Sequence, residues 1–235
     1  SVVSYTGNYT ANQTVGHGLN KTPDVLIVKA RGKVASWPVW HKDLTSADYT
    51  LELETSDAEA SVPSRFGALP TSSVFKIGSS GFTNALAPDN EMIAYCFAEV
   101  EGFSSFGSYV GVGSGNTVNV VTGFEPAMII IKRTDSIEDW KIIDNKRGDF
   151  ANSLEPNEAI AEEVGNNANF LLSANGFTIG DPHGDYNANG GSYIYMAFAA
   201  DPTTVEWLLI LGIVLHLIRQ VFGFMILELL LEEEQ

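Results

Sequence analysis

Carboxylates gather at two places in the chain, and the first place suggests hydrolysis. Glu52, Glu54 and Asp57 lie close together. A glycosidase needs two carboxyl groups, about 5–5.5 Å apart for retention and about 6.5–9.5 Å apart for inversion. Residues 51–54 alternate Leu-Glu-Leu-Glu, which is typical of a strand with one face in water. We therefore predict that these carboxylates face solvent and are not catalytic.

The second place is residues 181–189, which read Asp-Pro-His-Gly-Asp-Tyr-Asn-Ala-Asn. Hard cations such as calcium bind six to eight oxygen ligands. Asp181, Asp185 and Asn187 are therefore the candidate metal ligands. The spacing is not that of an EF-hand, and Asx-rich turns have the same composition. We predict no cofactor, with calcium at this segment as the alternative.

Aromatic side chains are the third source of chemistry, because sugar rings stack on them. Trp40 and His41 are adjacent, and Tyr186 lies inside the acidic segment. These three are the candidate glycan-binding residues. A place in the hydrophobic core is the prediction for Trp37 and Trp140, and it is also the preferred interpretation for Trp40.

Composition limits the partners. The formal net charge is −16, and the 13 Lys and Arg residues form no basic run. Proteins hold phosphate backbones with clustered Lys and Arg. We therefore predict no nucleic-acid partner. The single cysteine, Cys96, allows no internal disulfide, so the fold must depend on packing.

The elements that position these residues occur twice. Residues 23–29 read PDVLIVK and residues 126–132 read PAMIIIK, and Trp37 matches Trp140 in the same register. A repeat of about a hundred residues has the size of a domain and exceeds a solenoid unit. Short apolar runs rich in β-branched residues, separated by Gly and Asn turns, predict strands. One short helix is predicted from Glu158, capped by Asn157.

The predicted fold class is therefore all-β, with two tandem repeated β-sandwich units of jelly-roll or lectin-like type and a C-terminal hydrophobic α-helix. We place the first unit at residues 1–99, a linker at 100–108, the second unit at 109–203, and the helix with its acidic tail at 204–235.

The C-terminal segment 205–231 is almost entirely apolar and is long enough to span a bilayer. Arg219 at its middle opposes insertion, because a charge at bilayer centre costs about 2.5–3.5 kcal/mol. Burial in an oligomer or a partner protein is the preferred interpretation; a membrane segment or a shifted reading frame are the alternatives. Seven residues fit a heptad seam that would form the oligomer contact: Leu208, Leu211, Leu215, Ile218, Phe222, Met225 and Leu229.

Several strand and turn motifs resemble the repeated β-domain of tailed-phage and prophage structural proteins, often grouped with concanavalin A-like lectin/glucanase sandwiches. The resemblance covers residues 1–203. It is carried mainly by residues 4–8, 16–19, 23–29, 70–75, 94–107, 123–126, 131–136, 173–180 and 190–199.

This resemblance implies a non-enzymatic virion component, most often a tail fibre or spike. We expect a homo-oligomer that contacts other virion proteins and a host-surface polysaccharide through exposed loops. Weak sites would gain affinity through copy number. A tail glycan depolymerase and a capsid decoration protein are the alternatives. The C-terminal helix departs from the family pattern.

Overall fold

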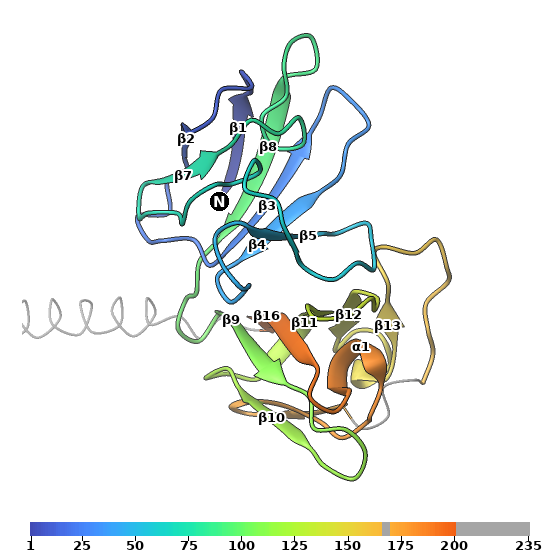
Figure 1. The fold of residues 1–235 in the computed structure, drawn as a ribbon. Helices are drawn as coiled ribbons and strands as arrows, with labels where there is room; N and C mark the ends of the chain where they lie inside the picture. The colour runs from blue at the N-terminus through green and yellow to red at the C-terminus, as the bar shows by residue number, and fades with distance from the viewer. Residues whose placement is uncertain (166–169, 201–235) are drawn as a thin grey trace, which may run out of the picture. The chain divides into compact units, whose positions relative to one another are not determined.

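The computed structural model describes residues 1–165 and 170–200, and these residues form an almost entirely β structure built from antiparallel sheets. The all-β prediction is confirmed. Figure 1 shows the strands. The first-half sheet has the order β1 (Val2–Thr6), β8 (Glu91–Phe97), β3 (Val25–Ala30), β4 (Pro38–His41), β5 (Tyr49–Glu52) and β6 (Ala60–Ser61). A two-stranded sheet, β2 (Gln13–Gly16) with β7 (Val74–Ile77), completes this half.

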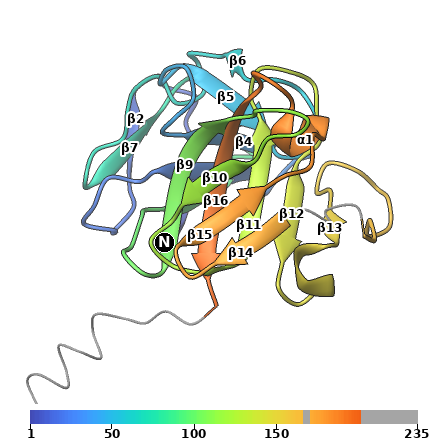
Figure 2. The same cartoon turned by 90° about the horizontal axis from the view of Figure 1, so that it is seen from below.

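The second half contains the remaining elements, seen from another side in Figure 2. The second-half sheet has the order β9 (Ser104–Val110), β16 (Ser192–Ala199), β11 (Pro126–Arg133), β12 (Lys141–Asp144) and β13 (Ser153–Leu154). A smaller sheet has the order β10 (Val118–Val121), β15 (Gly176–Ile179) and β14 (Phe170–Ser173). Two short helices are η1 (Gly148–Phe150) and α1 (Gly184–Asn187).

The first five strands of the first-half sheet correspond position by position to the five strands of the second-half sheet, and the first-half sheet has one further strand, β6. In each, the first strand of the half lies at one edge, the last strand lies beside it, and the next three follow in chain order. The register corresponds too, because Ile27 pairs with Val39 and Tyr95 while Ile130 pairs with Ile142 and Met196. The offset between these partners is the one seen in the sequence repeat.

The central strands form where the sequence has continuous apolar runs. Val25 and Val28 in β3, and Ile129 and Ile131 in β11, are completely buried. Strands covered on both faces have this pattern. One large-sheet face packs on the small sheet of its own half, and the other face, here called the inner face, belongs to a core shared by both halves. This shared core includes Val25, Val39, Leu44, Leu51, Phe106, Trp140, Ile194 and Met196.

Two local predictions differ from the structure. Residues 104–110, predicted to lie largely in a linker, form the edge strand β9. The stretch has few apolar residues, and one of these, Phe106, packs in the shared core. The segment from Glu158 is not helical. Asn157, predicted as its cap, instead accepts the backbone N–H of Trp140 at 2.9 Å.

Hydrogen bonds that involve the backbone of residues 52–59 join the two halves. Trp140 Nε1 donates to the carbonyl of Glu52 at 3.0 Å, and Lys132 Nζ donates to the carbonyl of Ser56 at 3.1 Å. The N–H of Glu59 donates to the carbonyl of Thr134 at 2.9 Å. Within the described ranges, no helix has the length and apolar character needed to cross a bilayer.

Candidate functional site

In the described part of the chain, a cluster of buried charges surrounds Lys141 on β12. Its ammonium contacts Glu155 just after β13, Glu163 at 2.6 Å and Asp185 on α1 at 3.1 Å. The side chains of Lys141, Glu155 and Asp185 are at most 5% exposed, and Glu163 is 28% exposed. A lysine ammonium has three N–H donors, so each carboxylate can receive one.

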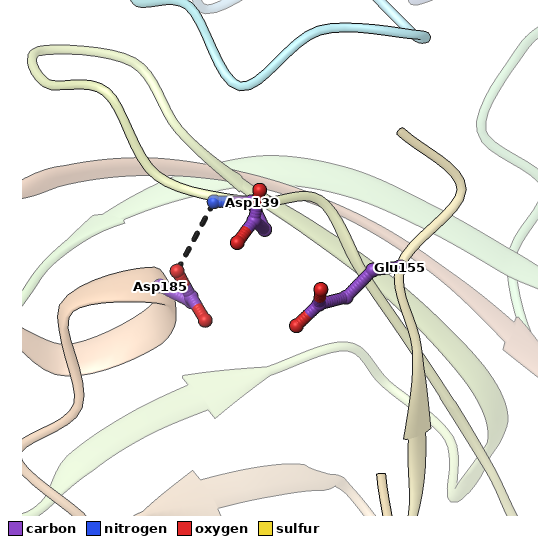
Figure 3. Close-up of side chains that lie close together, drawn as sticks. All are labelled: Asp139, Glu155 and Asp185. Atoms are coloured by element: carbon purple, nitrogen blue, oxygen red, sulfur yellow. Dashed lines mark hydrogen bonds between the residues drawn. The ribbon is translucent and has the colours of Figure 1, made fainter. Parts of the chain in front are cut away.

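Three acidic side chains from separate parts of the chain, Asp139, Glu155 and Asp185, lie close together, as Figure 3 shows. One carboxylate oxygen from each lies within 4.8 Å of the others. Asp185 also accepts the backbone N–H of Asp139 at 3.1 Å and lies 3.2 Å from His183 Nδ1. Oxygen ligands at this spacing could hold a cation, but the ammonium of Lys141 already lies against two of the three.

The electrostatics of the group follow from burial and pairing. Burial alone would lower the pKa of Lys141, but the hydrogen bonds to Glu155 and Glu163 and the charge of Asp185 raise it well above its ordinary value. Burial raises the pKa of Glu155, and Lys141 opposes that shift. The cluster is therefore a buried ion network whose lysine stays protonated and whose carboxylates are engaged with it.

The structure separates the three predicted metal ligands. Asp185 belongs to the ion network, whereas Asp181 is outside the group of converging carboxylates. Asn187 is completely buried and serves the fold, because its Oδ1 accepts the N–H groups of Val112 at 2.8 Å and Gly113 at 3.3 Å. The segment does not bring the three together as one cation site. No sequence pattern pointed to Lys141, because it is distant from residues 181–189 in the chain.

Asn84 has the same role in the first half as Asn187 in the second. It is completely buried, and its Oδ1 accepts the N–H groups of Asn8 at 2.6 Å and Tyr9 at 3.0 Å. In both halves these amides follow the first strand. The preceding tyrosines also correspond, since Tyr5 donates to the carbonyl of Thr83 and Tyr109 to the carbonyl of Tyr186.

The three candidate glycan-binding residues are all buried. Trp40 is 3% exposed, and His41 and Tyr186 are each 1% exposed. Trp40 packs in the first-half core, and Tyr186 packs in the second-half core. Burial also lowers the pKa of His41 to about 4. Since stacking needs an accessible ring face, none of the three offers the surface that the prediction required.

The first acidic cluster is only partly in water. Glu52 forms an ion pair with Arg65, and Glu54 accepts the backbone N–H of Trp37 at 2.9 Å. Asp57 is exposed. The alternating pattern predicted solvated carboxylates, and that prediction is wrong for Glu52 and Glu54, because the loop after β5 folds back on the start of β4.

An unforeseen feature is a row of five directly paired inner-face residues across each large sheet. The first-half row is Leu51, Val39, Ile27, Tyr95 and Val2, and the second-half row is Leu154, Ile142, Ile130, Met196 and Phe106. In the first half, Leu51 is 1% exposed and Val2 is 63% exposed. In the second half, exposure changes along the row in the opposite direction: Phe106 is 3% exposed and Leu154 is partly exposed.

The open end of the first-half row carries aromatic and basic side chains. Trp37 stacks on Tyr95 with centroids 6.5 Å apart, and Lys29 Nζ lies 5.2 Å from the centre of the Trp37 ring. All three are partly exposed. A shallow hollow of about 230 Å³ lies nearby, lined by Ser4, Tyr5, Thr6, Arg31, Glu91 and Met92. We define Val2, Lys29, Trp37, Ile93 and Tyr95 as the open face.

The seven residues predicted to form the heptad seam, Leu208 to Leu229, lie outside the described residues. A family model described as a domain of unknown function (DUF7483) matches residues 1–202. No curated protein and no solved structure matches the chain.

Proposed function

Since the chain belongs to the DUF7483 family, whose name specifies no activity, we propose from the site itself that it is a structural virion protein. It is a tail fibre or spike component made of two copies of one β-sandwich unit. The observation that carries the proposal is the pair Asn84 and Asn187, each buried and each accepting two successive backbone amides after the first strand of its half. Such a shared device supports duplication of the whole unit.

The ion network supports a structural role over a hydrolytic one. A retaining or inverting glycosidase keeps two carboxyl groups free to exchange protons with the substrate. Here Glu155 and Asp185 are both buried against the ammonium of Lys141. Breaking such a network leaves uncompensated buried charge, so the network favours stability of the fold over turnover.

Motif resemblance supports the virion location. The strand and turn signatures at residues 1–203 resemble those of repeated β-domains in phage structural proteins, and such domains are expected to be all-β, as this chain is. Contact with a host-surface polysaccharide would take place through exposed loops, with weak sites multiplied by copy number.

Location on the particle tests the proposal directly. Antibodies against the chain are bound to phage particles induced from the strain that encodes it, and the particles are imaged by electron microscopy. We expect label on the tail. Label on the capsid surface would instead support a decoration protein, and particles that carry no label would overturn the virion assignment.

Turnover is tested separately. Purified protein is incubated with polysaccharide from the host surface, and new reducing ends are measured. We expect none above the buffer control, together with retention of the protein on immobilised polysaccharide. A steady release of reducing ends that Glu155→Gln abolishes would replace the structural proposal with the depolymerase alternative.

A further inference from the structure

We infer that the open face is the docking surface for a second copy of this chain, which places its segment 155–164 there. The inference rests on the duplication proposed above. It starts from a difference between the two halves of one molecule. Residues on the inner face of the second half are buried by the first half, whereas the equivalent residues of the first half remain partly exposed. Trp140, Lys132 and Ile194 are at most 2% exposed, whereas their counterparts Trp37, Lys29 and Ile93 are partly exposed.

The covering element in the second half is main chain from the first half. The carbonyl of Glu52 accepts Trp140 Nε1, and the carbonyl of Ser56 accepts both Lys132 Nζ at 3.1 Å and the N–H of Glu138 at 3.0 Å. Residues 52–59 therefore complete this surface as a protein contact. Because the open face repeats the same residue types in the same register, its natural occupant is the equivalent protein segment.

Residues 155–164 are that equivalent segment, because Leu154 ends β13 at the register position that Leu51 has in β5. Two large apolar side chains on it are in water: Ile160 is 54% exposed and Val164 is 73% exposed. By correspondence with the first half, the carbonyl of Glu155 would reach the Trp37 indole and the carbonyl of Ala159 would reach the Lys29 ammonium.

Charge also favours this pairing. The chain has a net charge of −16, yet the open face includes Lys29, and Arg31 lines the hollow near it. The segment that would cover them contains Glu158 and Glu162, which are not among the carboxylates paired with Lys141. Within one chain, the acidic segment 52–59 already lies on Lys132. Complementary charge speeds encounter and fixes the register of two partners.

The geometry also sets the kind of assembly. The open face belongs to the first half and its occupant to the second half, so the two contact surfaces differ. Such a heterologous contact adds copies head to tail and gives either a ring or an open array. A fibre component needs this property, whereas a two-fold contact would stop at a dimer.

Disulfide trapping in the full chain tests the contact residue by residue. The double variant Lys29→Cys/Ala159→Cys is oxidised gently and separated on a non-reducing gel. We expect a ladder of linked copies, while each single-cysteine variant remains at the monomer position. The native Cys96 is buried and serves as the internal control. Absence of the ladder, or an equal amount of dimer from either single variant, would overturn the inference.

Complementation tests the head-to-tail order. Val2→Glu disables the open face, and Ile160→Glu disables the exposed segment 155–164, while circular dichroism checks that each variant is folded. By analytical ultracentrifugation, each variant alone should lose the concentration-dependent growth of the wild type, and an equal mixture should form pairs only. Leu171→Glu, on the outside of the small sheet, is the matched control and should behave as wild type.

Three results would contradict the inference. The first is a variant that alone still forms larger assemblies as its concentration rises. The second is an equal mixture that fails to form pairs, and the third is a wild type that keeps one fixed size at all concentrations. An oligomer held only through residues 204–235 would give that fixed size. If the chain is monomeric and Val2→Glu instead abolishes retention on host polysaccharide, the open face is a glycan site. Particle labelling is independent of these outcomes, so the virion assignment and the docking surface can fail separately.

Discussion

Trp140 donates its indole N–H to the carbonyl of Glu52 at 3.0 Å, and so this buried tryptophan of the second half is held by the first half. Trp37, the equivalent residue, makes its ring contacts with Tyr95 and Lys29 and stays partly exposed. The two residues occupy equivalent positions, and their backbone N–H groups make equivalent hydrogen bonds. Trp37 donates to the Glu54 carboxylate and Trp140 to Asn157 Oδ1, each at 2.9 Å.

This pair gives the first prediction. Trp140→Ala should lower the free energy of unfolding by about 3–5 kcal/mol, because it opens a large cavity in the shared core. Trp37→Ala should cost less than about 2 kcal/mol, because water already reaches that ring. Urea denaturation at low protein concentration measures both. Equal losses would show that the two inner faces are covered alike in solution.

Asn187→Ala is the second prediction. The variant leaves the N–H groups of Val112 and Gly113 without their acceptor inside the fold. Each unsatisfied buried group costs about 1–3 kcal/mol, so we expect a loss of roughly 2–4 kcal/mol in unfolding free energy by urea titration. Asn189→Ala, two residues away and exposed, should change it by less than about 0.5 kcal/mol. Similar effects of the two substitutions would refute the role given to Asn187.

Lys141→Met is the third prediction. Removing the ammonium leaves buried carboxylates uncompensated, a change that costs about 3–5 kcal/mol. Burial already raises the pKa of Glu155. An acid whose folded pKa is raised destabilises the fold when ionised, so lowering the pH should relieve the deficit of this variant. Melting temperatures from pH 7 to pH 4.5 test this, with the exposed Lys146→Met as control. If the melting temperature of Lys141→Met lies below that of the wild type by the same amount at every pH, the buried ion network is refuted as the cause.

Calcium gives the fourth prediction, because the ammonium of Lys141 already lies against the converging carboxylates. Millimolar calcium should leave the melting temperature of the wild type unchanged. A ligand that binds only the folded state would raise it in proportion to the logarithm of its concentration. A rise in the wild type that Asp185→Asn removes would instead restore the calcium alternative for this segment.

His41 provides the fifth prediction. Burial lowers its folded pKa to about 4, below the ordinary value of 6.5. The unfolded chain therefore binds more protons between these values, and stability falls as the pH drops from about 6.5 toward 4. The total loss in unfolding free energy across this pH range is about 3 kcal/mol. In His41→Asn, whose Oδ1 can still accept the N–H of Asp43, this part of the pH dependence should disappear from chemical denaturation curves. An unchanged slope would place the titration elsewhere.

Short-range patterns in the sequence were enough to predict the strands. The apolar runs within residues 23–29 and 126–132 form the central strands β3 and β11. The helix predicted at Glu158 failed, because Asn157 binds Trp140 from outside the segment. Local propensity gives no information on such a tertiary contact.

The candidate site was harder to predict for the same reason. Trp40 and Tyr186 carry both an apolar ring and a polar group, yet the first-half and second-half cores enclose them, and His41 is buried as well. Lys141 meets Asp185 only because β12 and α1 adjoin in space. Equivalent residues such as Val2 and Phe106 differ in exposure because only one end of each sheet is covered, and a repeat in sequence carries no sign of which end.

Gly7 and Gly111 lie against Ala85 and Ala188 so closely that a Cβ atom would stand 2.4 Å and 2.1 Å from the alanine carbonyl oxygens. Any side chain at either position would push the first strand of its half away from the asparagine that holds it. The spacing Tyr-x-Gly, followed by Asn-Ala some 75 residues later, can therefore identify single-unit ancestors or longer arrays in genomes, where overall similarity has faded.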